Sequence, residues 1–105
     1  MSQSSTAQIT FFFVYMIYSK QRNASYVGYT VDILKRLNAH NHNKGAKFTK
    51  GSHWELIYSK RFKNKILAMK YEYKLKKNRN IRKKLLNRHL LLYNGYFTFY
   101  IIFSK

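Results

Sequence analysis

Residues 11–41 read FFFVYMIYSKQRNASYVGYTVDILKRLNAHN, and the hydrophobic pattern changes along this stretch. The run from Phe11 to Tyr18 is dense in aromatic and β-branched side chains, which is typical of a buried strand. A polar segment from Ser19 to Ser25 predicts a turn, and an apolar pattern resumes from Ser25 to Tyr29. These residues therefore predict a β-hairpin.

The residues after the hairpin predict a helix that ends at about Asn41. Thr30 can cap this helix, and Asp32 in the first turn would interact favourably with the positive end of the helix dipole. Spacings of three and four residues place four side chains on one helical face. These are Ile33, Arg36, Leu37 and His40.

The remaining chain predicts a third strand and two more helices. A polar loop at residues 41–52 precedes an alternating segment from Trp54 to Lys60. Residues 64–77 form a helical pattern whose apolar face also contains Glu72, and residues 78–90 predict a last helix. The order β-β-α-β-α-α predicts a small α+β domain with an antiparallel sheet.

The 105 residues are enough for one domain, and 46% of them are hydrophobic. We expect a disordered tail at 1–10, the folded domain at 11–90, and an aromatic extension of unknown role at 91–105. The absence of cysteine excludes disulfides, zinc–thiolate sites and cysteine nucleophiles. The apolar segments lack the features of a signal peptide or a membrane span. We expect a cytoplasmic protein, either a monomer or a weak dimer, that binds neither a membrane nor a small-molecule cofactor.

The charge is strongly unbalanced, with 21 Lys and Arg against 3 Asp and Glu and a formal net charge of +18. Such a field attracts polyanions, and nucleic acid is the commonest partner of a small basic domain. An AT-rich genome, which favours Lys, Asn, Ile, Tyr and Phe codons, is an alternative source of this composition. Charge alone therefore favours nucleic-acid binding and leaves the choice between DNA and RNA open.

The carboxylates Asp32, Glu55 and Glu72 are the complete set available for acid chemistry. Glu72 is unusual because it lies on an apolar helical face, where a carboxylate needs an arginine, another base or a metal as partner. Arg36 could bind a phosphate bidentately, pair with Glu72 or extend to water. The histidines, including His40, do not form a metal-ligand spacing.

Two tripeptides at a fixed distance give a sharper indication. FVY at residues 13–15 is followed by YVG at residues 26–28, and Arg36 comes ten residues after Tyr26. This pattern resembles the GIY-YIG nuclease family, in particular its short single-domain bacterial members. Phe13 stands where the first family tripeptide has glycine. The loop 44–51, the strand 54–58 and the helix 68–76 are also similar to segments of those short members.

The resemblance implies a three-stranded antiparallel sheet flanked by helices and an endonuclease that uses one divalent metal. Glu72 would hold Mg²⁺ or Mn²⁺, which favour oxygen ligands. Arg36 would bind the scissile phosphate and stabilise its developing charge. Tyr15 and Tyr26 would line the site, one of them orienting or deprotonating the water. His40 is a second candidate for the general base.

Basic side chains would bind the DNA backbone, which carries no sequence information. We therefore expect a structure-selective or weakly sequence-selective enzyme in DNA repair or processing. The alternatives are an inactive nucleic-acid-binding module, an RNA ligand or substrate, and a membrane-surface protein. The candidate DNA-binding residues are Lys47, Lys74, Lys76, Lys77, Arg79 and Arg82.

Overall fold

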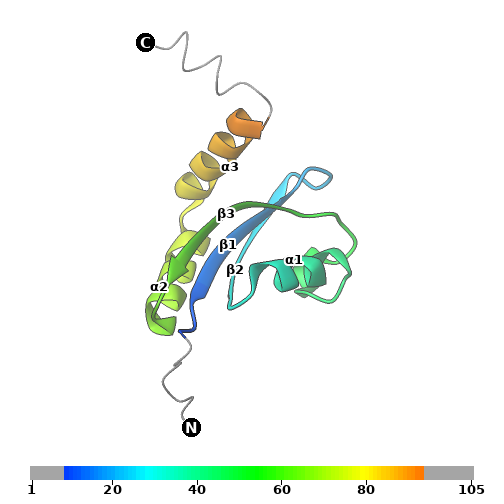
Figure 1. The fold of residues 1–105 in the computed structure, drawn as a ribbon. Coiled ribbons are helices and arrows are strands. Elements are labelled where there is room, and N and C mark those ends of the chain that lie inside the picture. Colours follow the sequence, from blue (N-terminus) through cyan, green and yellow to red (C-terminus); the bar gives the residue numbers. More distant parts are fainter. Residues whose placement is uncertain (1–8, 94–105) are drawn as a thin grey trace, which may run out of the picture.

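The computed structural model describes residues 9–93 (Figure 1). Strands β1 (Phe12–Ser19) and β2 (Ala24–Thr30) form the predicted hairpin, and helix α1 (Ile33–Asn41) follows it. A short 3₁₀ helix, η2 (Lys47–Thr49), precedes β3 (Glu55–Phe62). Helices α2 (Lys65–Lys77) and α3 (Arg79–Tyr93) complete the described chain. All three strands are antiparallel in the order β2-β1-β3, which confirms the predicted α+β fold class.

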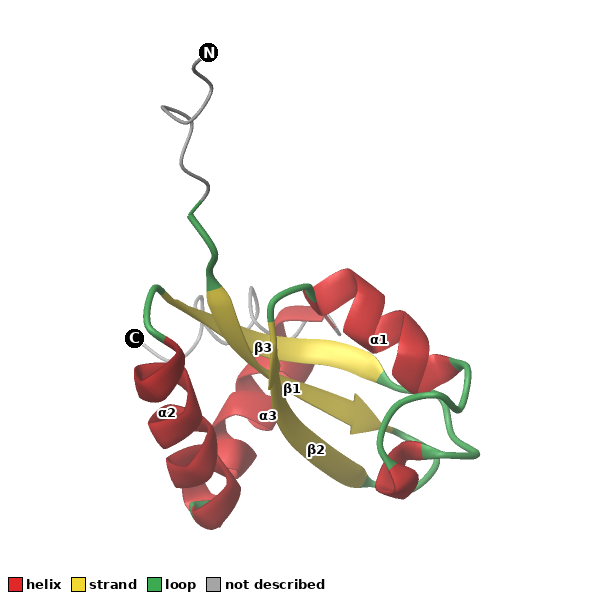
Figure 2. Ribbon diagram, turned by 90° about the horizontal axis from the view of Figure 1, so that it is seen from below, coloured by secondary structure: helices red, strands yellow, loops and turns green. Residues whose placement is uncertain are grey.

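The alternation of side chains along β1 builds the two sides of the core. Val14 and Met16 pack with Ala68 and Leu75 of α2, whereas Tyr15 and Ile17 pack with Trp54 on the other face. Figure 2 shows α1 and the pair α2–α3 on opposite sides of the sheet. Because successive strand residues point to opposite faces, Tyr15 lies on the side of α1.

The helix starts are fixed by side-chain caps, and one predicted cap is wrong. Asp32, and not Thr30, caps α1 by accepting a hydrogen bond from the Lys35 amide at 3.0 Å. The Thr30 hydroxyl instead accepts from the Asp32 amide at 3.1 Å. Asn64 and Asn78 accept bonds from the first turns of α2 and α3. Each cap satisfies amides that have no partner within the helix.

The described residues include only parts of the two expected terminal segments. Helix α3 continues to Tyr93, so the first three residues of the expected extension at 91–105 belong to a helix. The rest of that extension, and residues 1–8 of the expected N-terminal tail, lie outside the described residues. Phe13, at the position of the family glycine, pairs with Thr30 and Arg61 inside the sheet. Within residues 9–93, no helix is long and apolar enough to cross a membrane.

Candidate active site

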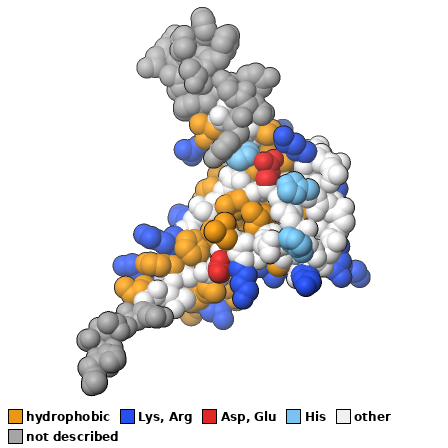
Figure 3. Space-filling model, turned by 45° about the vertical axis from the view of Figure 1, so that its right-hand side comes forward, with side chains coloured by type: hydrophobic (Ala, Val, Ile, Leu, Met, Phe, Trp, Pro, Cys, Tyr) orange, Lys and Arg blue, Asp and Glu red, His pale blue; other side chains and the backbone are white. Residues whose placement is uncertain are grey.

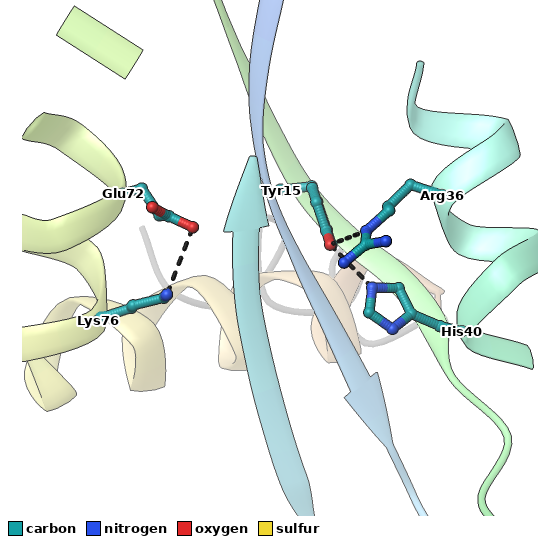
Figure 4. A network of polar contacts seen from close by, with 5 residues as sticks. All are labelled: Tyr15, Arg36, His40, Glu72 and Lys76. Carbon is teal, nitrogen blue, oxygen red and sulfur yellow. Dashed lines mark hydrogen bonds and ion pairs between the residues drawn. The ribbon is translucent and has the colours of Figure 1, made fainter. Parts of the chain in front are cut away.

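Tyr15 and His40 form the centre of the candidate site. The Tyr15 hydroxyl lies 2.8 Å from Nε2 of His40, although the two residues are 25 positions apart in the sequence (Figure 4). Both side chains are buried, His40 completely. Strand β1 directs Tyr15 toward α1, and the last turn of α1 carries His40 toward the sheet. Sequence reasoning selected both residues without predicting their direct contact.

Thr49 fixes the tautomer of His40. The Thr49 hydroxyl donates its proton to the carbonyl oxygen of Ala46 at 2.8 Å and lies 2.8 Å from Nδ1 of His40. Since that proton is committed to Ala46, the Thr49 oxygen must accept from Nδ1–H. Nε2 then carries the lone pair and accepts from the Tyr15 hydroxyl. A buried chain of hydrogen bonds therefore runs from Tyr15 through His40 to the loop.

Arg36 contacts the same hydroxyl from one turn earlier in α1. Its Nε donates to the Tyr15 oxygen at 3.3 Å, and it interacts with Tyr26 as well. The Tyr26 ring packs edge-on to His40 with the ring centroids 5.1 Å apart. Four of the five predicted catalytic residues thus lie together. The predicted alternative of an Arg36–Glu72 pair is not formed.

The environment holds the proton on Tyr15 and leaves His40 neutral. Burial raises the pKa of Tyr15, with the hydrogen bond and charge of Arg36 acting in the opposite direction. Burial and then the charge of Arg36 lower the pKa of His40. The Tyr15 contact in turn raises the pKa of Arg36. The resting site therefore pairs a phenol donor with an imidazole acceptor beside a permanent cation.

Two glycines leave the space that this pair occupies. Gly28 lies opposite Tyr15 in the sheet, and a Cβ there would lie 2.5 Å from the Tyr15 hydroxyl oxygen. A Cβ at Gly45 would lie 2.3 Å from Nδ1 of His40. Side chains larger than hydrogen would displace the reactive groups at both positions. The tripeptide YVG at residues 26–28 thus supplies Tyr26 to the site, and its Gly28 leaves room for the Tyr15 side chain.

Glu72 lies across strand β2 from Tyr15, Arg36 and His40. Figure 4 shows Glu72 on α2 and the Tyr15–Arg36–His40 cluster on opposite sides of this strand. The Glu72 carboxylate is 17% exposed and lies 3.4 Å from Nζ of Lys76, which is the simple ion pair left open above. Its negative charge still contributes to the raised pKa of Tyr15. The structure therefore places Glu72 near the cluster and not in contact with it.

The donor set of the described residues fits a divalent ion that is held by a single carboxylate. Among the described residues, no group of three or more His, Asp or Glu side chains could enclose a metal. Mg²⁺ commonly binds through one or two carboxylates, with water and substrate phosphate completing its shell. A single accessible carboxylate such as Glu72 fits that arrangement. The other two acids serve elsewhere: Asp32 caps α1 and Glu55 lies 3.8 Å from His89.

The predicted DNA-binding residues lie on the surface. Lys47 is exposed within the loop 44–51, and Lys74, Lys76, Lys77 and Arg79 are exposed along α2 and the start of α3. Arg82 is less exposed, because its guanidinium donates to the Leu75 carbonyl at 2.9 Å at the end of α2. On the face in Figure 3, Lys and Arg side chains surround exposed hydrophobic groups.

Thr49 is the site residue that sequence reasoning did not select. It is completely buried, and its backbone carbonyl also accepts from the Trp54 indole at 2.8 Å. A threonine in a polar loop ordinarily indicates a turn or solvent contact. The available signal was its place within the loop 44–51, which already resembled the short family members.

Comparisons with known proteins show the family of this chain. The model of the GIY-YIG catalytic domain matches residues 11–87. The chain is 43% identical over 74 residues to the UPF0213 protein YazA of Bacillus subtilis, covering 70% of this chain and 74% of that one. It is 45% identical over 74 residues to a UPF0213 protein of Vibrio campbellii, covering 70% of each.

A solved structure is also similar. The solution NMR structure of the UPF0213 protein BH0048 from Bacillus halodurans has 33% sequence identity and a TM-score of 0.46, covering 73% of this chain and 83% of that chain. The family match spans the β1–β2 hairpin, α1, the loop 44–51 and α2, which carry the candidate catalytic residues. The chain therefore belongs to the GIY-YIG family, whose catalytic domain is that of a nuclease superfamily.

Proposed function

We propose that this protein is a metal-dependent endonuclease that hydrolyses DNA phosphodiester bonds. The observation that carries the proposal is the buried chain of hydrogen bonds from Tyr15 through His40 to Thr49, with Arg36 on the Tyr15 hydroxyl. Packing of the core alone does not require a buried imidazole acceptor, His40, to face the Tyr15 hydroxyl beside Arg36. Such groups with perturbed pKa values are typical of functional sites.

In this proposal Tyr15 is the general base and His40 prepares it. The Tyr15 proton passes to Nε2 of His40, and the phenolate oxygen takes a proton from water. The water oxygen bonds to phosphorus, the bond from phosphorus to the 3′ oxygen breaks, and the leaving oxygen takes a proton from solvent. His40 then releases its extra proton to solvent, which restores the resting site. Thr49 keeps Nδ1 protonated throughout, so His40 accepts at Nε2 only. Tyr26 lines the site beside His40.

The first transfer is unfavourable in the free protein, because the pKa of Tyr15 is raised and that of His40 is lowered. Positive charge near the phenolate oxygen is therefore needed. Arg36 already supplies one cation at that oxygen, and its remaining guanidinium nitrogens would bind the scissile phosphate. Glu72 would hold Mg²⁺ or Mn²⁺, which when bound would polarise the phosphate and stabilise the leaving oxygen.

The surface supports weak sequence selectivity. The exposed lysines of α2 are suited to phosphates, and phosphate contacts position a protein without reading bases. The described residues contain one small α+β unit and no added module that would enter a groove. We therefore propose that the enzyme recognises DNA structure more than sequence, in repair or processing of DNA.

The test is a nicking assay on supercoiled plasmid and branched DNA with Mg²⁺ or Mn²⁺. Wild type is compared with Glu72→Ala and Tyr15→Phe. We expect Glu72→Ala to abolish metal-dependent cutting while DNA binding remains. Tyr15→Phe should reduce cutting about 10²- to 10⁴-fold, the usual contribution of a positioned base.

A matched control is available on the other face of the sheet. Tyr58 and Tyr71 share a hydroxyl hydrogen bond at 2.8 Å outside the site, so Tyr58→Phe removes a comparable phenol. Its cutting rate should match wild type. Tight DNA binding without cutting by wild type, on every substrate and with either metal, would replace the proposal by an inactive nucleic-acid-binding module. Cutting of RNA in preference to DNA would correct the substrate.

A further inference from the structure

A surface cleft of about 290 Å³ opens directly beside the candidate active site. It lies between β2, the loop that contains η2, and the facing parts of α2 and α3. Tyr26 belongs to both places, since it lines the cleft and packs against His40. The lining residues are Ser25, Tyr26, Val27, Phe48, Lys76 and Arg82.

Phe48 is the unusual residue of this cleft. The residue is 47% exposed, and its ring also contacts the buried Trp54 of the α1-side core, with the ring centroids 6.0 Å apart. It is nevertheless held in place, because the Arg22 guanidinium lies 4.4 Å from the ring centroid and donates to the Phe48 carbonyl. Tyr26 lies nearly parallel to it, at 21° with the centroids 6.2 Å apart. Phe48 is thus an exposed ring with a fixed orientation.

Two basic side chains also line the cleft. Lys76 and Arg82 line it, and the Arg82 guanidinium is fixed by its bond to the Leu75 carbonyl. A fixed aromatic ring with cations beside it matches a nucleotide, whose base stacks on the ring and whose phosphate pairs with the cations. Bases inside a duplex are covered on both faces by their neighbours. An unpaired nucleotide is therefore the part of a DNA substrate that can stack on Phe48.

We propose that this cleft binds an unpaired nucleotide of the DNA substrate, with its base stacked on Phe48 and its phosphate between Lys76 and Arg82. This inference rests on the proposed function for the nature of its ligand. It makes Phe48 a determinant of substrate structure: DNA with a single-stranded segment beside the cut is bound better than intact duplex. Stacking accepts every base, so this preference carries little sequence information.

The experiment measures binding without cutting. Fluorescence anisotropy is recorded with a labelled oligothymidine and with a blunt duplex of the same length, in EDTA and at several salt concentrations. Phe48→Ala should weaken binding of the single strand about 5- to 150-fold, the range expected for one lost stacking contact. Duplex affinity should change less than about twofold. The salt dependence should keep its slope because no charge is removed.

Two further variants make the result specific. Phe48→Trp keeps a stacking ring and should retain single-strand affinity. Phe11→Ala is the matched control, because the Arg61 guanidinium lies 4.4 Å from the Phe11 ring centroid, as Arg22 does from that of Phe48, but Phe11 does not line the cleft. It should leave both affinities unchanged. Should Phe48→Ala unfold, Phe48→Leu, which keeps apolar volume without a ring, replaces it.

Equal losses for single strand and duplex, or no loss for either, would overturn the proposal. Loss of single-strand affinity in Phe48→Trp as large as in Phe48→Ala would do the same. These outcomes are independent of the nuclease test, since no metal is present. A protein that stacks single strands but never cuts refutes the proposed function alone, whereas one that cuts without the Phe48 effect refutes this inference alone.

Discussion

Replacing Gly45 by alanine tests whether the loop was built around His40. The added Cβ would lie 2.3 Å from Nδ1, 2.8 Å from Cγ and 2.9 Å from Cε1 of that ring. The ring is fully buried and held at both nitrogens, so it can move only by breaking a hydrogen bond. Overpacking costs about 1–3 kcal/mol, and a buried polar group without a partner costs about 1–3 kcal/mol.

These two costs overlap, because moving the ring relieves the clash by breaking the bond. We therefore expect Gly45→Ala to lower the free energy of unfolding by roughly 2–4 kcal/mol. For a domain of this size each kcal/mol lowers the melting temperature by about 4–8 °C. Urea unfolding at pH 7.5 measures the first quantity, and thermal unfolding followed by circular dichroism measures the second.

A double-mutant cycle identifies the cause. In a His40→Ala background the ring is absent, so Gly45→Ala should cost little there, and the coupling between the two positions should approach the full single-mutant effect. Gly51→Ala is the control, because its backbone has φ +85° and nothing lies within 4 Å of its Cβ position. Its cost comes from the backbone and should persist without His40. A Gly45→Ala penalty that is equally large in both backgrounds would refute the reasoning.

Three other expectations follow from the same geometry. Gly28→Ala would place a Cβ 2.5 Å from the Tyr15 hydroxyl oxygen. The nicking rate of plasmid DNA should fall about 10²-fold or more, as expected for a misplaced catalytic group. A normal rate would mean that Tyr15 can move freely. Arg36→Lys keeps the charge but loses the guanidinium fork, so filter binding should show DNA affinity within about threefold of wild type, and nicking should fall about 10²- to 10³-fold. Because the pKa of His40 is lowered in the folded state, the unfolded chain binds more protons to this residue; its stabilising contribution is complete above the ordinary pKa of about 6.5 and is lost as the pH falls through the lowered value. Urea unfolding between pH 7.5 and 5 should show this loss, and the step should be smaller in His40→Gln.

The hairpin and the helical faces could be predicted because their signals are local. A period of two along β1 and spacings of three and four along α1 place each side chain before any tertiary contact is known. This is why Arg36 and His40 were expected on one face and both are found beside Tyr15. The prediction of a cap at Thr30 is wrong for a local reason as well. Thr30 and Asp32 are both good capping residues and lie two positions apart, so the sequence pattern does not distinguish them.

The burial of His40 could not be predicted, because it depends on a loop. The segment that contains Gly45 and Thr49 folds over the imidazole, and its polar composition indicates only a surface loop. The position of Glu72 was hidden for a different reason. Its apolar helical face was correctly recognised, but the face of the sheet that α2 covers depends on the path of the chain after β3. The pattern within the helix carries no such information.

The partner of Glu72 also bears on its suitability as a metal ligand. The chain has 21 Lys and Arg against three acids, so a pairing for Glu72 is expected. A bidentate arginine would have bound both carboxylate oxygens. The observed partner is Lys76, which follows by one helical turn and is 48% exposed, so the pair stabilises the fold by at most about 1 kcal/mol. A pair this weak leaves the carboxylate available to a divalent ion, and Lys76 already lines the cleft where a DNA phosphate would be bound. Lys76 can therefore pair with Glu72 in the free protein and contact a phosphate of the DNA backbone once substrate is bound.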